Sequence, residues 1–103
     1  MGKPVTPEII VEITLYPSEV GGRKGAILQG EYRGVLGVGS ENFSVRFFVP
    51  FEDGFSPSQT QRFGVQFLVP EAALPHFPAG AEFSVWEGRV IGSGRVLEVL
   101  RHA

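Results

Sequence analysis

The stretch EGRVIGSGRVLEVL, at residues 87–100, places three glycines, Gly88, Gly92 and Gly94, in what is otherwise a β-strand pattern. Glycine weakens the interior of a strand, so its presence there indicates a β-bulge, a sharp bend or the close approach of another backbone. Strands of a small closed barrel must bend sharply, and bulges and glycines provide such bends. We therefore predict that these glycines are corner and bulge positions in the strand that closes a barrel.

The rest of the chain predicts more strands, separated by turns. Pro70 and Pro75 limit residues 71–74 to a single helical turn, so no long helix is expected. Because closure removes exposed strand edges, the predicted fold class is all-β: a small, closed, six-stranded antiparallel barrel of Greek-key type. The other segments that alternate apolar and polar residues, or are otherwise typical of strands, are EIIVEITLY (8–16), AILQGEYRGVLGV (26–38), FSVRFFV (43–49), RFGVQFLV (62–69) and AEFSVWE (81–87).

The alternation also predicts which side chains face the core. At the start of the first segment, Ile9 and Val11 are expected inside, and Glu8 is expected on the opposite, solvent-facing side. In RFGVQFLV, the same spacing predicts that Phe67 and Val69 point inward.

Length and composition limit what the chain can be. With 103 residues it is expected to form one domain, a barrel of residues 8–103 preceded by a lead-in of residues 1–7. A net charge of −2 disfavours a general nucleic-acid binder, because such domains are usually basic. The absence of cysteine excludes disulfides and thiolate chemistry. Neither a signal peptide nor an apolar run of membrane-spanning length is visible, so we expect a cytoplasmic protein that does not bind membranes.

Residues that could support catalysis are few. His76 lies in a proline-rich loop and His102 next to the C-terminus, and two such histidines supply neither a catalytic triad nor a metal site. The adjacent Glu52 and Asp53 are expected to be solvated on a turn. GVLGVG, at residues 34–39, lacks the lysine and the following helix of a phosphate-binding loop. The sequence therefore predicts a protein that is not an enzyme and holds no metal, cofactor or nucleotide.

Two groups of residues could instead form binding surfaces. Arg23 and Lys24 share a loop, and with arginines on the strands they are either ordinary solvated charges or a small patch that recognises phosphate or acidic groups. In FFVPFEDGF, at residues 47–55, Phe48 is expected to point outward, with Phe51 and Phe55 on a loop. These rings either fold over one end of the barrel or form an exposed apolar patch for a partner.

Three stretches together resemble the C-terminal β-barrel domain of bacterial elongation factor Tu. They are VEITLYPSEVGGRKGAILQG (11–30), EYRG (31–34) and FSVWEGRVIGSGRVLEVL (83–100), and the likeness covers roughly residues 8–100. The resemblance implies a six-stranded barrel without catalytic activity, which in that family contacts the T-stem of aminoacyl-tRNA and partner proteins. By matching position, Arg33 corresponds to the tRNA-side arginine, and Glu87 with Gly88 to the acid–glycine pair at the T-stem.

The chain departs from the family pattern at the tRNA-contacting positions. Glu31 precedes Tyr32 and Arg33, Gly34 replaces the family proline, and one glycine is missing before Arg89. We therefore predict a stand-alone barrel that binds a protein partner, through FFVPFEDGF or through the end that carries Glu87. The alternative is residual binding of tRNA or other RNA, and a third possibility is a ligand-binding pocket at the barrel mouth. The candidate binding residues are Arg23, Tyr32, Arg33, Phe48, Phe51, Phe55, Glu87 and Gly88.

Overall fold

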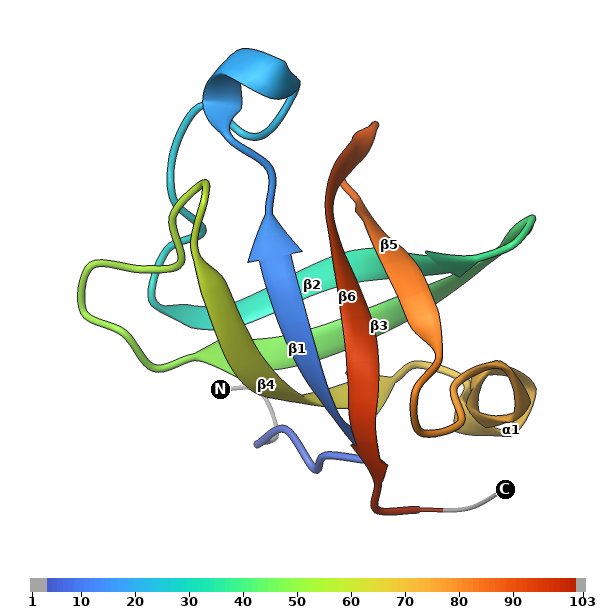
Figure 1. Cartoon of the computed structure of the whole chain (residues 1–103). Coiled ribbons are helices and arrows are strands. Elements are labelled where there is room, and N and C mark those ends of the chain that lie inside the picture. The colour runs from blue at the N-terminus through green and yellow to red at the C-terminus, as the bar shows by residue number, and fades with distance from the viewer. Residues whose placement is uncertain (1–3, 102–103) are drawn as a thin grey trace.

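The computed structural model describes residues 4–101, and these form a closed barrel of six antiparallel strands (Figure 1). Around the barrel the strands follow the order β1-β4-β3-β2-β5-β6, and the predicted fold class is confirmed. Three short helical pieces lie between strands: the 3₁₀ turn η1 (Ser18–Val20), α1 (Pro70–Ala73) and the 3₁₀ turn η2 (Leu74–His76). The strands are β1 (Ile9–Leu15), β2 (Gly30–Val38), β3 (Glu41–Val49), β4 (Thr60–Phe67), β5 (Glu82–Trp86) and β6 (Val90–Val99).

The strand order is that of a Greek key. β2, β3 and β4 follow one another as neighbours, whereas β1 pairs with β4 on one side and with β6 on the other. The chain therefore crosses one end of the barrel between β1 and β2, through η1 and the loop that follows it (Figure 1). This crossing brings the loop after η1 next to the turn between β5 and β6.

The barrel core consists of the inward side chains of all six strands, with phenylalanines at its centre. The four alternating apolar residues of β1 are all buried, as the sequence predicts. Phe47 stacks at 4.6 Å on Phe63, and Phe67 at 4.8 Å on Phe77, measured between ring centroids. Burial of one such side chain contributes roughly 1.5–3 kcal/mol to folding.

The glycines of residues 87–100 serve two different purposes. Gly88 has a φ of +73°, which L side chains rarely adopt, and it lies in the turn between β5 and β6 rather than within a strand. A Cβ on Gly92 would sit 2.6 Å from the carbonyl oxygen of Thr14, and one on Gly94 would sit 2.5 Å from that of Glu12. Glycine is therefore required at positions 92 and 94 because the backbone of β1 approaches closely there. Bending of the strand, the predicted reason, is less important.

The bulges of β6 lie at residues other than these glycines. The register of β6 shifts against β5 between Val85 and Trp86, which leaves Ile91, next to Gly92, without an opposite residue. A second shift, against β1, leaves Leu97 unmatched. β6 therefore has bulges, as predicted, but they lie at Ile91, one residue before Gly92, and at Leu97, three residues after Gly94.

Two predictions of burial are wrong, each for a local reason. Glu8 is 5% exposed rather than solvent-facing, because its Oε1 accepts a hydrogen bond from the backbone N–H of Phe67 and its Oε2 pairs with Arg101, both at 2.8 Å. Val69 is 52% exposed rather than inward, because β4 ends at Phe67 and Pro70 begins α1.

The lead-in before β1 contacts the barrel along residues 4–7. The carbonyl oxygen of Pro4 accepts a hydrogen bond from Arg46, and the N–H of Thr6 donates to the Gln66 side chain at 3.1 Å. Pro7 covers Gly64 so closely that a Cβ there would lie 2.7 Å from the proline ring. Within residues 4–101, no helix has the length and apolar character needed to cross a membrane.

Candidate functional site

Three of the predicted binding residues meet at the turn between β5 and β6. The Glu87 carboxylate accepts a hydrogen bond from Nε of Arg23 at 2.8 Å and another from the Tyr32 hydroxyl at 2.6 Å. Arg23 comes from the loop after η1 and Tyr32 from β2, so three distant segments converge on one carboxylate. Gly88 is the next residue of the same turn. We call this part of the barrel, with Arg23, Tyr32, Glu87 and Gly88, the Glu87 end.

These contacts determine the protonation states of Glu87 and Tyr32. Partial burial by itself would raise the pKa of Glu87, but the hydrogen bonds from Arg23 and Tyr32 outweigh it and hold that pKa below its ordinary value. Burial, reinforced by the hydrogen bond to Glu87, raises the pKa of Tyr32. At neutral pH the carboxylate is therefore ionised and the phenol keeps its proton.

The arginines of the Glu87 end mostly bind the protein itself. Arg89 donates from Nε to the carbonyl of Gly21 and from Nη2 to that of Gly22, each at 2.9 Å. Arg23 also donates from Nη1 to the carbonyl of Gly25 at 3.1 Å. The bonds of Arg89 link the loop after η1 to the β5–β6 turn, whereas the bond from Arg23 to Gly25 lies within that loop. A shallow hollow of about 280 Å³ remains there, lined by Arg23, Lys24, Gly25, Ala26, Glu87, Arg89 and Ile91.

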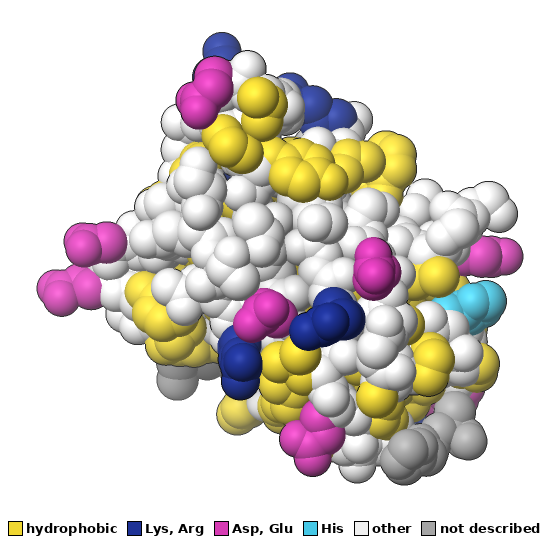
Figure 2. Space-filling view, in the orientation of Figure 1, with side chains coloured by type: hydrophobic (Ala, Val, Ile, Leu, Met, Phe, Trp, Pro, Cys, Tyr) yellow, Lys and Arg dark blue, Asp and Glu magenta, His cyan; other side chains and the backbone are white. Residues whose placement is uncertain are grey.

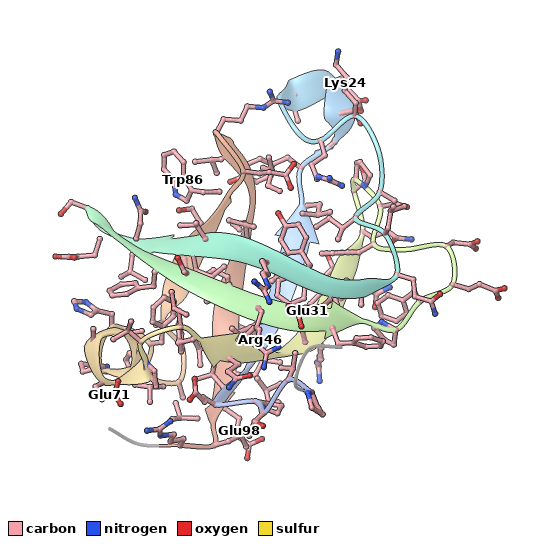
Figure 3. All side chains as sticks on the ribbon, turned by 180° about the vertical axis from the view of Figure 1, so that it is seen from behind. Lys24, Glu31, Arg46, Glu71, Trp86 and Glu98 are labelled. Atoms are coloured by element: carbon pink, nitrogen blue, oxygen red, sulfur yellow. The ribbon has the colours of Figure 1, made fainter. Side chains whose placement is uncertain are left out.

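Arg33 lies apart from the Glu87 end, on the outer face of β2. Its Nε donates to Oε2 of Glu31 at 2.7 Å, and the other oxygen of Glu31 accepts from Nη1 of Arg46 at 2.8 Å. Figure 3 shows Glu31 and Arg46 close together on β2 and β3. The hydrogen bond from Arg33, together with that from Arg46, holds the pKa of Glu31 below its ordinary value. Glu31 is thus a bridge between two arginines.

The predicted aromatic patch of FFVPFEDGF is only partly exposed. Phe55 is 0% exposed and stacks at 5.0 Å on Phe63, so it belongs to the core and cannot contact a partner. Phe51 packs against the same core, with its ring edge toward Phe63. Phe48 points outward and is 53% exposed. Folding over the barrel end is therefore the right interpretation for Phe51 and Phe55, and only Phe48 stays a surface residue.

A groove that the sequence does not predict runs along the outer surface beside β3. It consists of two adjoining hollows of about 510 Å³ and 310 Å³ that share Ser44 and Leu68, and we call it the β3 groove. Leu68 is 76% exposed, and its N–H donates to the carbonyl of Ser44 at 3.0 Å. The first hollow is lined by Arg33, Gly34, Val35, Ser44, Val45, Arg46, Gln66, Phe67 and Leu68, and the second by Asn42, Phe43, Ser44, Leu68, Val69, Ala72 and Ala73.

The groove lies over the outer side of β2, β3 and the end of β4. β3 and β4 pair only from Val45 to Phe47, after which the chain leaves the sheet at Leu68 and turns into α1. On the other side of the groove, Val35 pairs with Trp86 of β5, which Figure 3 shows beside that strand. The Trp86 indole covers Gly37 and donates from Nε1 to the Ser84 hydroxyl at 2.8 Å. Trp86 itself lines neither hollow.

The opposite face of the barrel has a different character. Figure 2 shows this face, over β1, β4 and β6, where acidic and basic side chains lie next to one another. Arg62 of β4, for example, lies 3.4 Å from Glu12 of β1. Charges that compensate one another in this way are typical of a solvated surface and point to no ligand.

The described residues suggest no metal site. Within residues 4–101, no group of three or more histidine, cysteine, aspartate or glutamate residues could hold a metal ion. His76 stacks on the ring of Phe43 at 5.0 Å, and His102 lies outside the described residues.

Comparison with known proteins does not assign the chain to a family. No protein-family model matches the chain, and no curated protein shows significant sequence similarity to it. The likeness to elongation factor Tu accordingly stays a prediction from the sequence.

Proposed function

We propose that this chain is a non-enzymatic barrel that binds a partner protein through the β3 groove. The observation that carries the proposal is the groove itself, where the exposed Leu68 and Val69 adjoin Arg33 and Arg46. Protein interfaces are enriched in arginine and aromatic residues and surround an apolar centre. Single exposed apolar residues are common, but neighbouring ones that line a continuous groove indicate an interaction site.

The family resemblance supports the same proposal. A barrel like the C-terminal domain of elongation factor Tu acts through contacts with other molecules rather than through catalysis, and we infer a cytoplasmic role of that kind. The surface differs from the one that the sequence predicts, because Phe55 is buried and the Glu87 end uses its arginines to hold a loop.

Capture from a lysate of the source cells tests this function. Tagged wild-type protein is compared with Leu68→Glu, which places a charge in the groove, and with Leu28→Glu as the matched control. Leu28 is equally apolar and 79% exposed, and it lines neither hollow. We expect nuclease-treated lysate to yield a protein that the wild type and Leu28→Glu retain and that Leu68→Glu loses. Equal capture by all three proteins would contradict the proposal.

RNA binding at the Glu87 end is the second candidate function. Its supporting observation is that Arg23, Lys24 and Arg89 surround a single carboxylate at the 280 Å³ hollow, which leaves an excess of positive charge. Binding through phosphates weakens steeply with salt, because it releases counterions from the nucleic acid. A labelled tRNA mixture that binds the wild type at low salt, and binds Lys24→Glu much less, would favour this function over the first.

A further inference from the structure

We propose that the β3 groove recognises a protein segment in which an acidic side chain neighbours an apolar one, with the carboxylate bound by Arg33. This inference rests on the proposed function and adds the chemistry of the partner. Its elements are one exposed guanidinium, an adjacent apolar surface and the absence of competing acidic groups among the described residues that line the groove.

The Arg33 side chain is held in place yet available. It is 77% exposed, and its single polar partner within residues 4–101 is Glu31, which binds Nε at 2.7 Å. Within residues 4–101, neither of the two terminal amino groups of the guanidinium makes a hydrogen bond. Such a pair of amino groups binds a carboxylate through two parallel hydrogen bonds, and fixing the guanidinium beforehand lowers the entropic cost of that binding.

The local charge favours an anion. Glu31 is paired with both Arg33 and Arg46, so two guanidiniums share one carboxylate at this end of the groove. None of the described residues that line the two hollows is acidic. An incoming carboxylate therefore meets attraction here, although the whole chain carries a net charge of −2.

The rest of the groove suits an apolar side chain. Val35, Leu68, Val69 and Ala72 present carbon atoms along its length, next to the ring of Phe43. A partner that buries an apolar side chain against Leu68 has a neighbouring residue within reach of the Arg33 end of the same hollow, because both residues line it.

A protein fits this surface better than a nucleic acid. A phosphate backbone presents a charge at every nucleotide and needs several exposed cations in a row. The groove has one mostly exposed cation among its described lining residues, since the Arg46 side chain is 20% exposed and bound to Glu31. One guanidinium is enough to bind one carboxylate. Apolar side chains of the partner can pack against the rest of the groove.

Selection from a displayed library of random short peptides on the wild-type chain tests the inference. Selected peptides are then synthesised with a fluorescent label, and their affinities are measured by anisotropy. The variants are Arg33→Gln, Arg33→Lys, Leu68→Glu and the control Arg62→Gln, which removes an exposed arginine that lines neither hollow. Thermal unfolding confirms that each variant is folded.

We expect selected peptides to contain aspartate or glutamate beside an apolar residue. Their affinity should fall about tenfold or more with Arg33→Gln, less with Arg33→Lys, and not at all with Arg62→Gln. Replacing the acidic residue of a peptide by its amide should have the same effect as Arg33→Gln and should add nothing to it.

Three results would overturn the inference, and each bears differently on the proposed function. Selected peptides whose affinity depends on Leu68 but not on Arg33 would agree with protein binding at the groove. They would contradict recognition of an acidic side chain by Arg33. Failure to select any Leu68-dependent peptide would reject recognition of a short segment, while lysate capture still decides protein binding. A wild-type dimer in sedimentation that Arg33→Gln dissociates would make a second copy the occupant.

Discussion

The Tyr32 hydroxyl donates a 2.6 Å hydrogen bond to Glu87, although Tyr32 lies in β2 and Glu87 in the turn between β5 and β6. β2 and β5 pair only from Val35 to Gly37, so this bond continues their association beyond the last pair of the sheet. The same carboxylate binds Arg23, and the bond therefore also connects the loop after η1 to the barrel wall.

Removing the Tyr32 hydroxyl should destabilise the barrel. We expect Tyr32→Phe to lower the free energy of unfolding by about 1 kcal/mol, because the ring keeps its contact with Phe47 and only the hydrogen bond is lost. Urea denaturation followed by circular dichroism measures this change. Tyr16→Phe serves as the control, since the Tyr16 hydroxyl makes no hydrogen bond within residues 4–101. Equal losses in both variants would show that the bond to Glu87 is not the cause.

The lowered pKa of Glu87 should make part of the stability depend on pH. Its folded-state pKa lies below the ordinary 4.5, so the contribution is complete above that value and is lost as the pH falls through the folded-state pKa. We expect the wild type to be more stable than Glu87→Gln at neutral pH, and the difference to shrink in acid. Unfolding free energies measured from pH 7 downward would refute this assignment if the difference stayed constant.

The glycine at position 94 should tolerate no side chain. A Cβ there would lie 2.5 Å from the carbonyl oxygen of Glu12 and 2.5 Å from the Phe83 ring, and the backbone of β1 cannot easily move. We expect Gly94→Ala to cost about 1–3 kcal/mol, the usual range for overpacking. Gly25→Ala is the matched control, because a Cβ at that position would meet nothing within 4 Å and the φ of Gly25 is not in the left-handed region. Thermal unfolding should separate the two variants clearly.

The buried carboxylate of Glu8 should matter more than an exposed one. Glu8→Ala leaves the N–H of Phe67 without its acceptor and Arg101 without its closest partner, and we expect a loss of about 2 kcal/mol or more. Glu12→Ala breaks an exposed pair with Arg62 and should cost under about 1 kcal/mol. Denaturant unfolding of the two variants compares these costs, and similar values would mean that Glu8 contributes no more than a surface charge.

Local patterns in the sequence predict most of the barrel. Alternation identifies the strands and nearly all of their inward residues, because side chains of a strand point to opposite faces in turn. It misplaces Glu8 and Val69, which lie at strand ends, since there the partner of a side chain comes from a distant segment or the chain has already left the sheet.

The binding surfaces depend on relationships that a single sequence does not contain. The convergence of Arg23, Tyr32 and Glu87 follows from the crossing of the chain between β1 and β2, which no spacing reveals. The β3 groove is lined by residues of β2, β3, β4 and α1, which lie far apart in the sequence. Two consecutive apolar residues, Leu68 and Val69, before Pro70 are its one local signal, and alternation assigns one of them to the core.

The pairing of β1 with β6 has a consequence for the biosynthesis of the protein. Ile9 pairs with Val99, so the first strand of the barrel cannot complete its pairing before the last strand of the barrel has been made. Until then, a growing chain exposes the hydrogen-bonding edge of β1, which other unfinished chains can bind. Contacts of such long sequence separation also slow folding to the range of milliseconds to seconds. The barrel therefore forms only after its final strand has been made. The protein is most prone to aggregation during translation, when many unfinished chains are close together.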